Sequence, residues 1–357
     1  MSNDYKTLVN IMLVGGNDGL NMLLDNDTYD MYKERRGSIA LDKTEILVLN
    51  DSNLAVHSKL FNIAKLYNNK ELAFVANVGP LMEHYTLDNY EKVEKPLKGS
   101  HNEMRRWVNS LNAGDLKKSG WIDRVLETID VSVNYEIEPN NQKALNLLES
   151  TYKNLFRNCM SRSESITELL SLPKLEVVLK NDKNALMKSL LSLVEIIKLR
   201  FELGLPRQVY HVGVRGYDTH SFQKRTHKDK LYPQLDDAIN DYVIGLKQIG
   251  MYNSVTTFIT SDFGRTIYSG NNDSTDHGEG GHYFVFGGAV KGGKLYGEMP
   301  DLSKDSKVIK SNVLIPQIAW EQYVATISKW FGLSENDLDK IFPLLRNFYS
   351  NDLGFMK

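Results

Sequence analysis

The first apolar run of the chain, residues 8–14 (LVNIMLV), leads directly into the turn Gly15-Gly16-Asn17-Asp18-Gly19. A short and nearly continuous apolar run is typical of a strand buried on both faces of a parallel sheet. Residues 58–67 then place apolar side chains at helical spacing, and residues 72–78 (LAFVANV) read as a second buried strand. The order strand, helix, strand predicts a βαβ unit and an α/β fold.

The remainder of the chain continues this alternation around a different middle segment. Residues 101–201 are long, polar and mostly helical in pattern, and predict a helical insertion or cap within one α/β domain spanning residues 1–357. Further buried strands are predicted at 208–214, 255–260 and 283–286, and amphipathic helices at 186–200, 231–249 and 317–331. The expected architecture is therefore a mainly parallel sheet between helices.

Composition excludes several classes of protein. The 357 residues contain 43 Lys+Arg and 45 Asp+Glu, with 41% apolar residues, close to the averages of globular proteins. Basic residues are spread along the chain, so nucleic-acid binding is not expected. The single cysteine excludes an intramolecular disulfide and a thiolate metal cluster, and no run approaches the roughly 20 apolar residues of a membrane span.

The first residues favour a cytoplasmic protein. Residues 1–7 are polar and are followed at once by the first predicted strand, which is not the pattern of a signal peptide. A chain whose leader had been removed would look the same, and it would then be an exported, periplasmic protein.

Acidic and imidazole side chains follow several of the predicted strands. In open α/β sheets, ligands bind beyond the carboxyl ends of the strands. Carboxylates and imidazoles without thiolates suit divalent ions such as Zn²⁺ or Mn²⁺. The clusters are Asn17-Asp18, Asp218-Thr219-His220, Ser261-Asp262, Asp276-His277-Gly278 and His282.

Each cluster also has a purely structural interpretation. Asp18 and the segment from Asp276 to Gly278 fit tight turns, and Asp218 fits a helix cap. A lone His220 is more often a hydrogen-bonded loop residue, and His282 can simply pack at the start of its strand. The joint pattern favours a site, because unrelated turns need not all fall at one edge of a sheet.

Ser100 is the candidate nucleophile. It follows Gly99 and precedes a helical pattern, so it is either a helix N-cap or a hydroxyl activated by a metal. The free N–H groups of that helix start also favour an anionic phosphate or sulfate.

Taken together, these motifs resemble the uncharacterised DUF1501 family, which is similar to the alkaline phosphatase and sulfatase superfamily. The resemblance covers nearly the whole chain and is weakest across the middle helices. The motifs occur in the order GGNDGLN (15–21), GSH (99–101), GYDTH (216–220), SDFGR (261–265), TDHG (275–278) and GGAVKGG (287–293).

The resemblance implies a metal-dependent hydrolase of phosphate or sulfate esters with an alkaline phosphatase-like fold. By this resemblance, Asp218, His220 and His277 would bind one metal ion. Asp262 would bind a second ion beside Asp18, the early metal ligand, and Ser100, the nucleophile. Arg265 would stabilise an anionic oxygen. Asn17, His101, Asp276 and His282 are possible additional members.

The sequence departs from the family pattern at the second metal. Asp262 stands where the family usually has Glu, and Phe263 stands where the superfamily often has His. Oxygen-only ligation there favours Mg²⁺, Mn²⁺ or Ca²⁺, or an empty site, so one or two divalent ions are expected. The sulfatase motif for a modified nucleophile is absent.

Two alternatives to the hydrolase stay open. The chain is either a non-catalytic or modified member that binds a metal or an anion, or a phosphomutase-like transferase. The expected partner is a small anionic ester.

Overall fold

The computed structural model describes residues 5–90, 99–111, 120–129, 134–137, 184–200, 206–268, 270 and 272–357. Much of the expected helical insertion at 101–201 lies outside the described residues, including the whole of 138–183. Within it, the structure describes three helices and one short strand.

Strands are present at all five apolar runs that predicted them, 8–14, 72–78, 208–214, 255–260 and 283–286. The bounds are β1 (Lys6–Val14), β2 (Leu23–Asp25), β3 (Ile46–Val48), β4 (Leu54–His57), β5 (Leu72–Gly79), β6 (Asn134–Ile137), β7 (Arg207–Arg215), β8 (Val255–Ser261), β9 (Gly281–Phe286), β10 (Lys294–Tyr296), β11 (Ile309–Lys310), β12 (Val313–Leu314) and β13 (Ile318–Ala319). Every residue of β5, β8 and β9 is buried, which accounts for their continuous apolar character.

The helices predicted at 58–67, 186–200, 231–249 and 317–331 are present, together with others that the sequence did not predict. The bounds are α1 (Gly19–Met22), α2 (Tyr29–Arg36), α3 (Phe61–Asn68), α4 (His101–Ser110), α5 (Trp121–Thr128), α8 (Ala185–Lys198), α10 (Gln223–Thr226), α11 (Tyr232–Gln248), α12 (Trp320–Phe331) and α13 (Glu335–Ile341). Helix α11 begins with a proline in its first turn and buries Leu235, Ala238, Ile239 and Tyr242 at the predicted 3/4 spacing.

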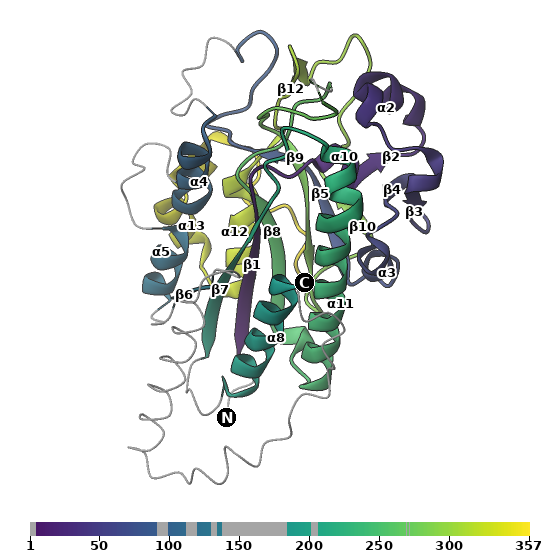
Figure 1. Cartoon of the computed structure of the whole chain (residues 1–357). Helices are drawn as coiled ribbons and strands as arrows, with labels where there is room; N and C mark the ends of the chain where they lie inside the picture. The colour runs from purple at the N-terminus through teal and green to yellow at the C-terminus, as the bar shows by residue number, and fades with distance from the viewer. Residues whose placement is uncertain are drawn as a thin grey trace, which may run out of the picture.

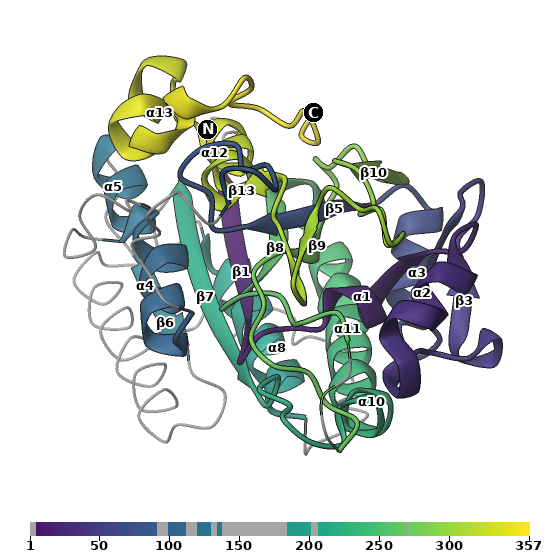
Figure 2. The ribbon, with the colours of Figure 1, turned by 90° about the horizontal axis from the view of Figure 1, so that it is seen from above.

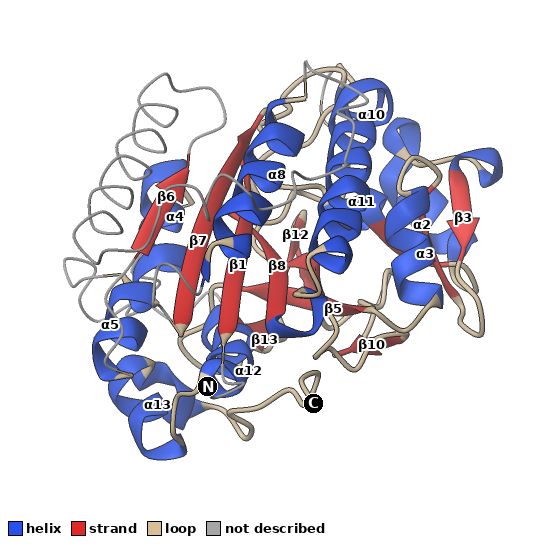
Figure 3. Cartoon of the chain, turned by 90° about the horizontal axis from the view of Figure 1, so that it is seen from below, coloured by secondary structure: helices blue, strands red, loops and turns tan. Residues whose placement is uncertain are grey.

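The main sheet is mixed but mainly parallel, with the order β10-β5-β9-β8-β1-β7-β6 and β13 paired to β5. All pairings are parallel except those of β9, which runs antiparallel to both β5 and β8. Helices α8 and α11 cover one face, while α12 and α4 pack on the other (Figures 1 and 3). The α/β class with a sheet between helices is thus confirmed.

Two features differ from the sequence-based expectations. Strands β1 and β5 are not neighbours, because β8 and β9 lie between them, so the opening segment is not a simple βαβ unit. The intervening residues instead form a small antiparallel sheet, β2-β4-β3, which lies beside α2 and α3 at the edge of the molecule (Figure 2). Strand β9 resembles the parallel strands in composition because it is buried just as completely.

No helix among the described residues is long and apolar enough to cross a membrane.

Candidate metal centre

The site lies beyond the carboxyl ends of three adjacent parallel strands. Val14 of β1 pairs with Arg215 of β7, and Leu13 pairs with Ser261 of β8. The loops that follow these strands therefore leave the sheet at the same edge, near the top of the view in Figure 1.

Three imidazoles and one carboxylate converge at this edge. His101, Asp218, His220 and His277 each offer a ligand atom, and all four atoms lie within 4.8 Å of one another. His220 Nε2 is 2.7 Å from Asp218 Oδ1, and His277 Nε2 is 3.6 Å from the same oxygen. The other carboxylate oxygen, Asp218 Oδ2, lies 3.2 Å from His101 Nε2.

Asp262 fixes the orientation of His101. It is fully buried, and its Oδ2 accepts a hydrogen bond of 2.7 Å from His101 Nδ1. Burial raises the pKa of Asp262, an effect opposed by this hydrogen bond. Because the proton of His101 is held on Nδ1, the lone pair of Nε2 is directed at the cluster.

His277 is held in the same way by a main-chain carbonyl. Its Nδ1 donates to Gly99 O at 3.1 Å, which again leaves Nε2 as the free acceptor. His277 Nε2 lies 3.2 Å from His220 Nε2, so two imidazole nitrogens face each other across the site. Burial lowers the pKa of His277, which favours its neutral, ligating form.

Arg265 holds the carboxylate of the cluster in place. Burial alone would raise the pKa of Asp218, but Arg265 and the neighbouring His101 and His220 outweigh it and hold the pKa below its usual range. Arg265 Nη2 donates to Asp218 Oδ1 at 2.8 Å and to Tyr217 O at 3.1 Å. Its Nε donates to Gly16 O at 3.0 Å. The predicted catalytic arginine is therefore fully engaged beneath the site, where it positions Asp218.

Glycine at position 15 allows the loops to approach this closely. Gly15 has φ +122°, and a Cβ there would lie 2.2 Å from the backbone nitrogen of Asp218. The glycine-rich turn of the sequence is thus explained by close packing of the first loop against the Asp218 loop.

The structure does not bring Asp18 into the cluster. Its side chain is buried, pairs with Arg36 of α2 and accepts hydrogen bonds from Gln223 and from the backbone of Asn21. The adjacent Asn17 is also buried, and its backbone N–H donates to Ser261 Oγ at 2.8 Å. The two residues belong to a buried polar network beside the cluster.

Ser100 caps helix α4. Its Oγ accepts a hydrogen bond from Glu103 N at 3.4 Å and donates to Glu103 Oε2 at 2.8 Å. Since Asp18 and Ser100 are engaged elsewhere, the described residues do not assemble the donor set expected for a second metal beside Asp262.

Two further predicted site residues, Asp276 and His282, lie outside the cluster, one exposed and one buried in the core. Asp276 is exposed at the rim, where its Oδ1 lies 3.8 Å from His220 Nδ1. His282 is completely buried, and its Nδ1 accepts a hydrogen bond from Asn77 N at 3.1 Å. Burial lowers the pKa of His282 to about 4, so this residue is a neutral part of the core.

Sequence reasoning missed Arg105. Its Nε lies 3.5 Å from Asp262 Oδ2 and donates to His101 O at 3.2 Å. Its spacing of four residues from His101 on one helix was the available signal, because such residues share a face. His101, predicted only as an additional member, is central to the cluster.

One segment of the chain matches the model of a known protein family. Residues 203–333 match the family described as "Protein of unknown function (DUF1501)". The resemblance to DUF1501 is thereby confirmed for the segment that carries Asp218, His220, Asp262 and His277. No curated protein matches the chain.

Several solved structures are similar at low identity. The C-terminal periplasmic domain of EcEptC from Escherichia coli is 11% identical, with a TM-score of 0.46 over 95% of this chain and 85% of that one. The PsFucS1 sulfatase from Pseudoalteromonas sp. is 13% identical, with a TM-score of 0.42 over 93% and 68%. The lipoteichoic acid synthase LtaP from Listeria monocytogenes is 9% identical, with a TM-score of 0.39 over 88% and 74%.

Proposed function

We propose that the chain is a hydrolase of phosphate or sulfate esters that depends on one divalent metal ion bound by His101, Asp218, His220 and His277. The convergence of these four side chains from distant loops is the observation that carries the proposal. The motif resemblance supplies the class of ester, and the expected substrate is a small anionic molecule.

The donor set fits a divalent transition metal. Three imidazole nitrogens and one carboxylate oxygen are ligands of Zn²⁺ or Mn²⁺. Donors around a tetrahedral ion with bonds of about 2.0–2.2 Å lie about 3.3–3.6 Å apart, and three separations of 3.2, 3.2 and 3.6 Å in the cluster are close to this. The 2.7 Å between His220 Nε2 and Asp218 Oδ1 is a hydrogen-bond distance, so these two groups would have to move apart to share an ion. The buried Nε2 of His101 lies 3.2 Å from Asp218 Oδ2 but accepts no hydrogen bond from the described residues, as expected of a lone pair that faces a ligand site.

A metal ion in this site would act as a Lewis acid toward the ester oxygens and increase the acidity of a coordinated hydroxyl or water. The protein side chains have separate tasks. Asp262 and the Gly99 carbonyl hold the protons of His101 and His277 on Nδ1, and Arg265 keeps Asp218 ionised.

Ser100 remains the proposed nucleophile. It directly precedes His101, and its hydroxyl donates to the Glu103 carboxylate. The same contact is the normal capping arrangement of a helix start, and it also places a carboxylate where it could accept the proton of the hydroxyl as a general base. Loss of the N-cap alone would cost about 1 kcal/mol of stability, whereas loss of a nucleophile would abolish turnover.

The test is an assay of the Zn²⁺- and Mn²⁺-loaded protein on aryl phosphate, phosphodiester and sulfate esters. We expect His220→Ala and Ser100→Ala to abolish turnover, while His84→Ala, at an exposed position outside the cluster, retains it. Equal turnover in wild type, His220→Ala and Ser100→Ala would disprove the site. Metal binding without turnover would identify a binding protein, and transfer of the phosphoryl group to a sugar would identify a transferase.

A further inference from the structure

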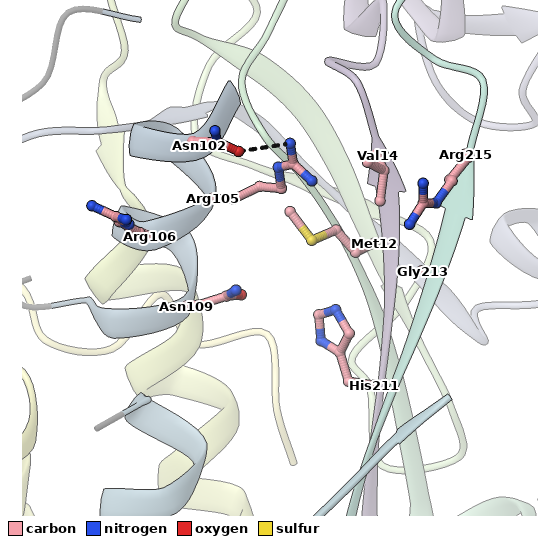
Figure 4. A pocket seen from close by; sticks show the side chains of 9 residues that line it. All are labelled: Met12, Val14, Asn102, Arg105, Arg106, Asn109, His211, Gly213 and Arg215. Atoms are coloured by element: carbon pink, nitrogen blue, oxygen red, sulfur yellow. Dashed lines mark hydrogen bonds between the residues drawn. The ribbon is translucent and has the colours of Figure 1, made fainter. Parts of the chain in front are cut away.

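A pocket of about 450 Å³ lies between α4 and the C-terminal halves of strands β1 and β7. This volume is within the range of about 300–1,000 Å³ typical of small-molecule sites. Figure 4 shows the helix on one side and the two strands on the other. The pocket is lined by Met12, Val14, Asn102, Arg105, Arg106, Asn109, His211, Gly213 and Arg215.

The lining is cationic. Of its nine described residues, three are arginines and none is acidic. Two of these arginines face the space between α4 and the strands, and the side chain of Arg106 extends from the other side of the helix (Figure 4). Arg105 and Asn109 extend from α4 toward the strands, and Arg215 extends from the end of β7 toward β1 (Figure 4). Guanidinium groups with amide donors are the residue types that bind phosphate and sulfate oxygens.

His211 adds a neutral hydrogen-bond donor. Asn10 Oδ1 accepts from Thr260 Oγ1 at 2.9 Å, which directs the amide nitrogen of Asn10 to His211 Nδ1 at 3.0 Å. Because an amide nitrogen only donates, Nδ1 accepts and the proton of His211 lies on Nε2. Burial lowers the pKa of His211 to about 4, so the ring is neutral near pH 7.

Arg105 connects the pocket to the metal cluster. Its Nη2 donates to Asn102 Oδ1 at 3.3 Å, as the dashed line in Figure 4 shows, and its Nε donates to His101 O at 3.2 Å. The same Nε lies 3.5 Å from Asp262 Oδ2. The pocket is therefore adjacent to the cluster, and one guanidinium contacts both.

We infer that this pocket binds a second oxyanionic group of the substrate, a phosphate or sulfate remote from the ester that is cleaved. The inference rests on the proposed function, and it names the substrate class as a small molecule with two anionic groups. The guanidinium group of Arg215 contributes positive charge, while Asn109 and His211 contribute neutral hydrogen-bond donors.

The binding test uses the full chain freed of metal with EDTA. Inorganic sulfate and inorganic phosphate are each titrated by calorimetry at constant ionic strength, with chloride as the balancing anion. We expect saturable binding of one anion per chain. Arg215→Gln and Asn109→Asp should weaken binding roughly tenfold or more, because hydrogen bonds between charged partners are lost or opposed.

Two variants control for nonspecific charge and for the cluster. Arg346→Gln removes the same charge from an exposed position elsewhere and should leave binding unchanged. His220→Ala should also bind the anion normally. Lack of saturable binding would overturn the inference, as would equal affinity in Arg215→Gln and Arg346→Gln, or loss of binding in His220→Ala with retention in Arg215→Gln.

A kinetic comparison tests the link to the substrate. With metal-loaded protein, a sugar bisphosphate should have a lower KM than the monophosphate of the same sugar, and Arg215→Gln should remove that difference without changing kcat. Equal KM values in the wild type would overturn the assignment. If neither these esters nor the aryl phosphate, phosphodiester and sulfate esters are hydrolysed, the proposed function fails, but the binding titration still decides whether the pocket is an anion site.

Discussion

Replacing Asp262 by Asn separates an orienting residue from a metal ligand. In the structure, Asp262 contacts His101 Nδ1 and lies near Arg105, and it is not among the four residues whose ligand atoms converge. Asn retains the size of the side chain and an oxygen that accepts from Nδ1, but it removes the charge.

The magnitude follows from the loss of a charge-assisted hydrogen bond. Such bonds are about twice as strong as neutral ones, and loss of a partner that orients a ligating histidine typically costs about 10–100-fold in metal affinity. This corresponds to about 1.4–2.7 kcal/mol of binding free energy. Substitution of a residue that ligates the metal directly should reduce the metal affinity further.

The assay is calorimetric titration of the metal-free chain with Zn²⁺ for wild type, Asp262→Asn and Asp218→Asn. We expect one ion per chain in Asp262→Asn with affinity reduced about 10–100-fold, and a larger loss in Asp218→Asn. Circular dichroism melts control for folding. Wild-type affinity in Asp262→Asn would refute the orienting role, and complete loss of binding there would make Asp262 a ligand.

Three other substitutions test the surroundings of the site. Burial raises the pKa of Glu321 from 4.5 to about 7. As the pH rises through this range, the unfolded chain releases the proton before the folded chain does, so the free energy of unfolding of the wild type should fall by about 3 kcal/mol. Glu321→Gln should reduce this pH dependence in denaturant titrations. Gly15→Ala should destabilise the fold by more than Gly250→Ala, since both have positive φ but only Gly15 lacks room for a Cβ; equal melting temperatures would contradict this. Asp18→Asn should lower the free energy of unfolding by about 3–5 kcal/mol, because it leaves the buried Arg36 charge unpaired. The number of metal ions bound per chain should not change. Loss of the metal in this variant would instead identify Asp18 as a ligand.

The sequence predicted where the strands lie along the chain better than which strands are adjacent in the sheet. The apolar runs that became β1, β5 and β8 are buried strands, because burial on both faces selects continuous apolar side chains, while β7 is buried mainly in its first half. The direction of β9 could not be predicted, since an antiparallel strand buried on both faces has the same composition. Strand order depends on contacts between residues about 200 positions apart, which local patterns do not contain.

The sequence predicted those site residues that reach the cluster simply because they follow a strand at one edge of the sheet. Asp218, His220 and His277 follow strands or adjacent loops at one edge of the sheet, and the structure brings them together. Asp18 has the same local pattern, a strand and then glycines. It differs because Arg36, brought close by helix α2, neutralises its carboxylate, and no local motif announces that partner.

The most direct test of the central claim is the metal content of the purified chain after equilibrium dialysis against Zn²⁺ or Mn²⁺, measured by elemental analysis. The account predicts one ion per chain in the wild type and in Asp18→Asn, and none in His220→Ala or His277→Ala. Absence of metal from the wild type, or equal metal content in wild type and both histidine variants, would contradict it.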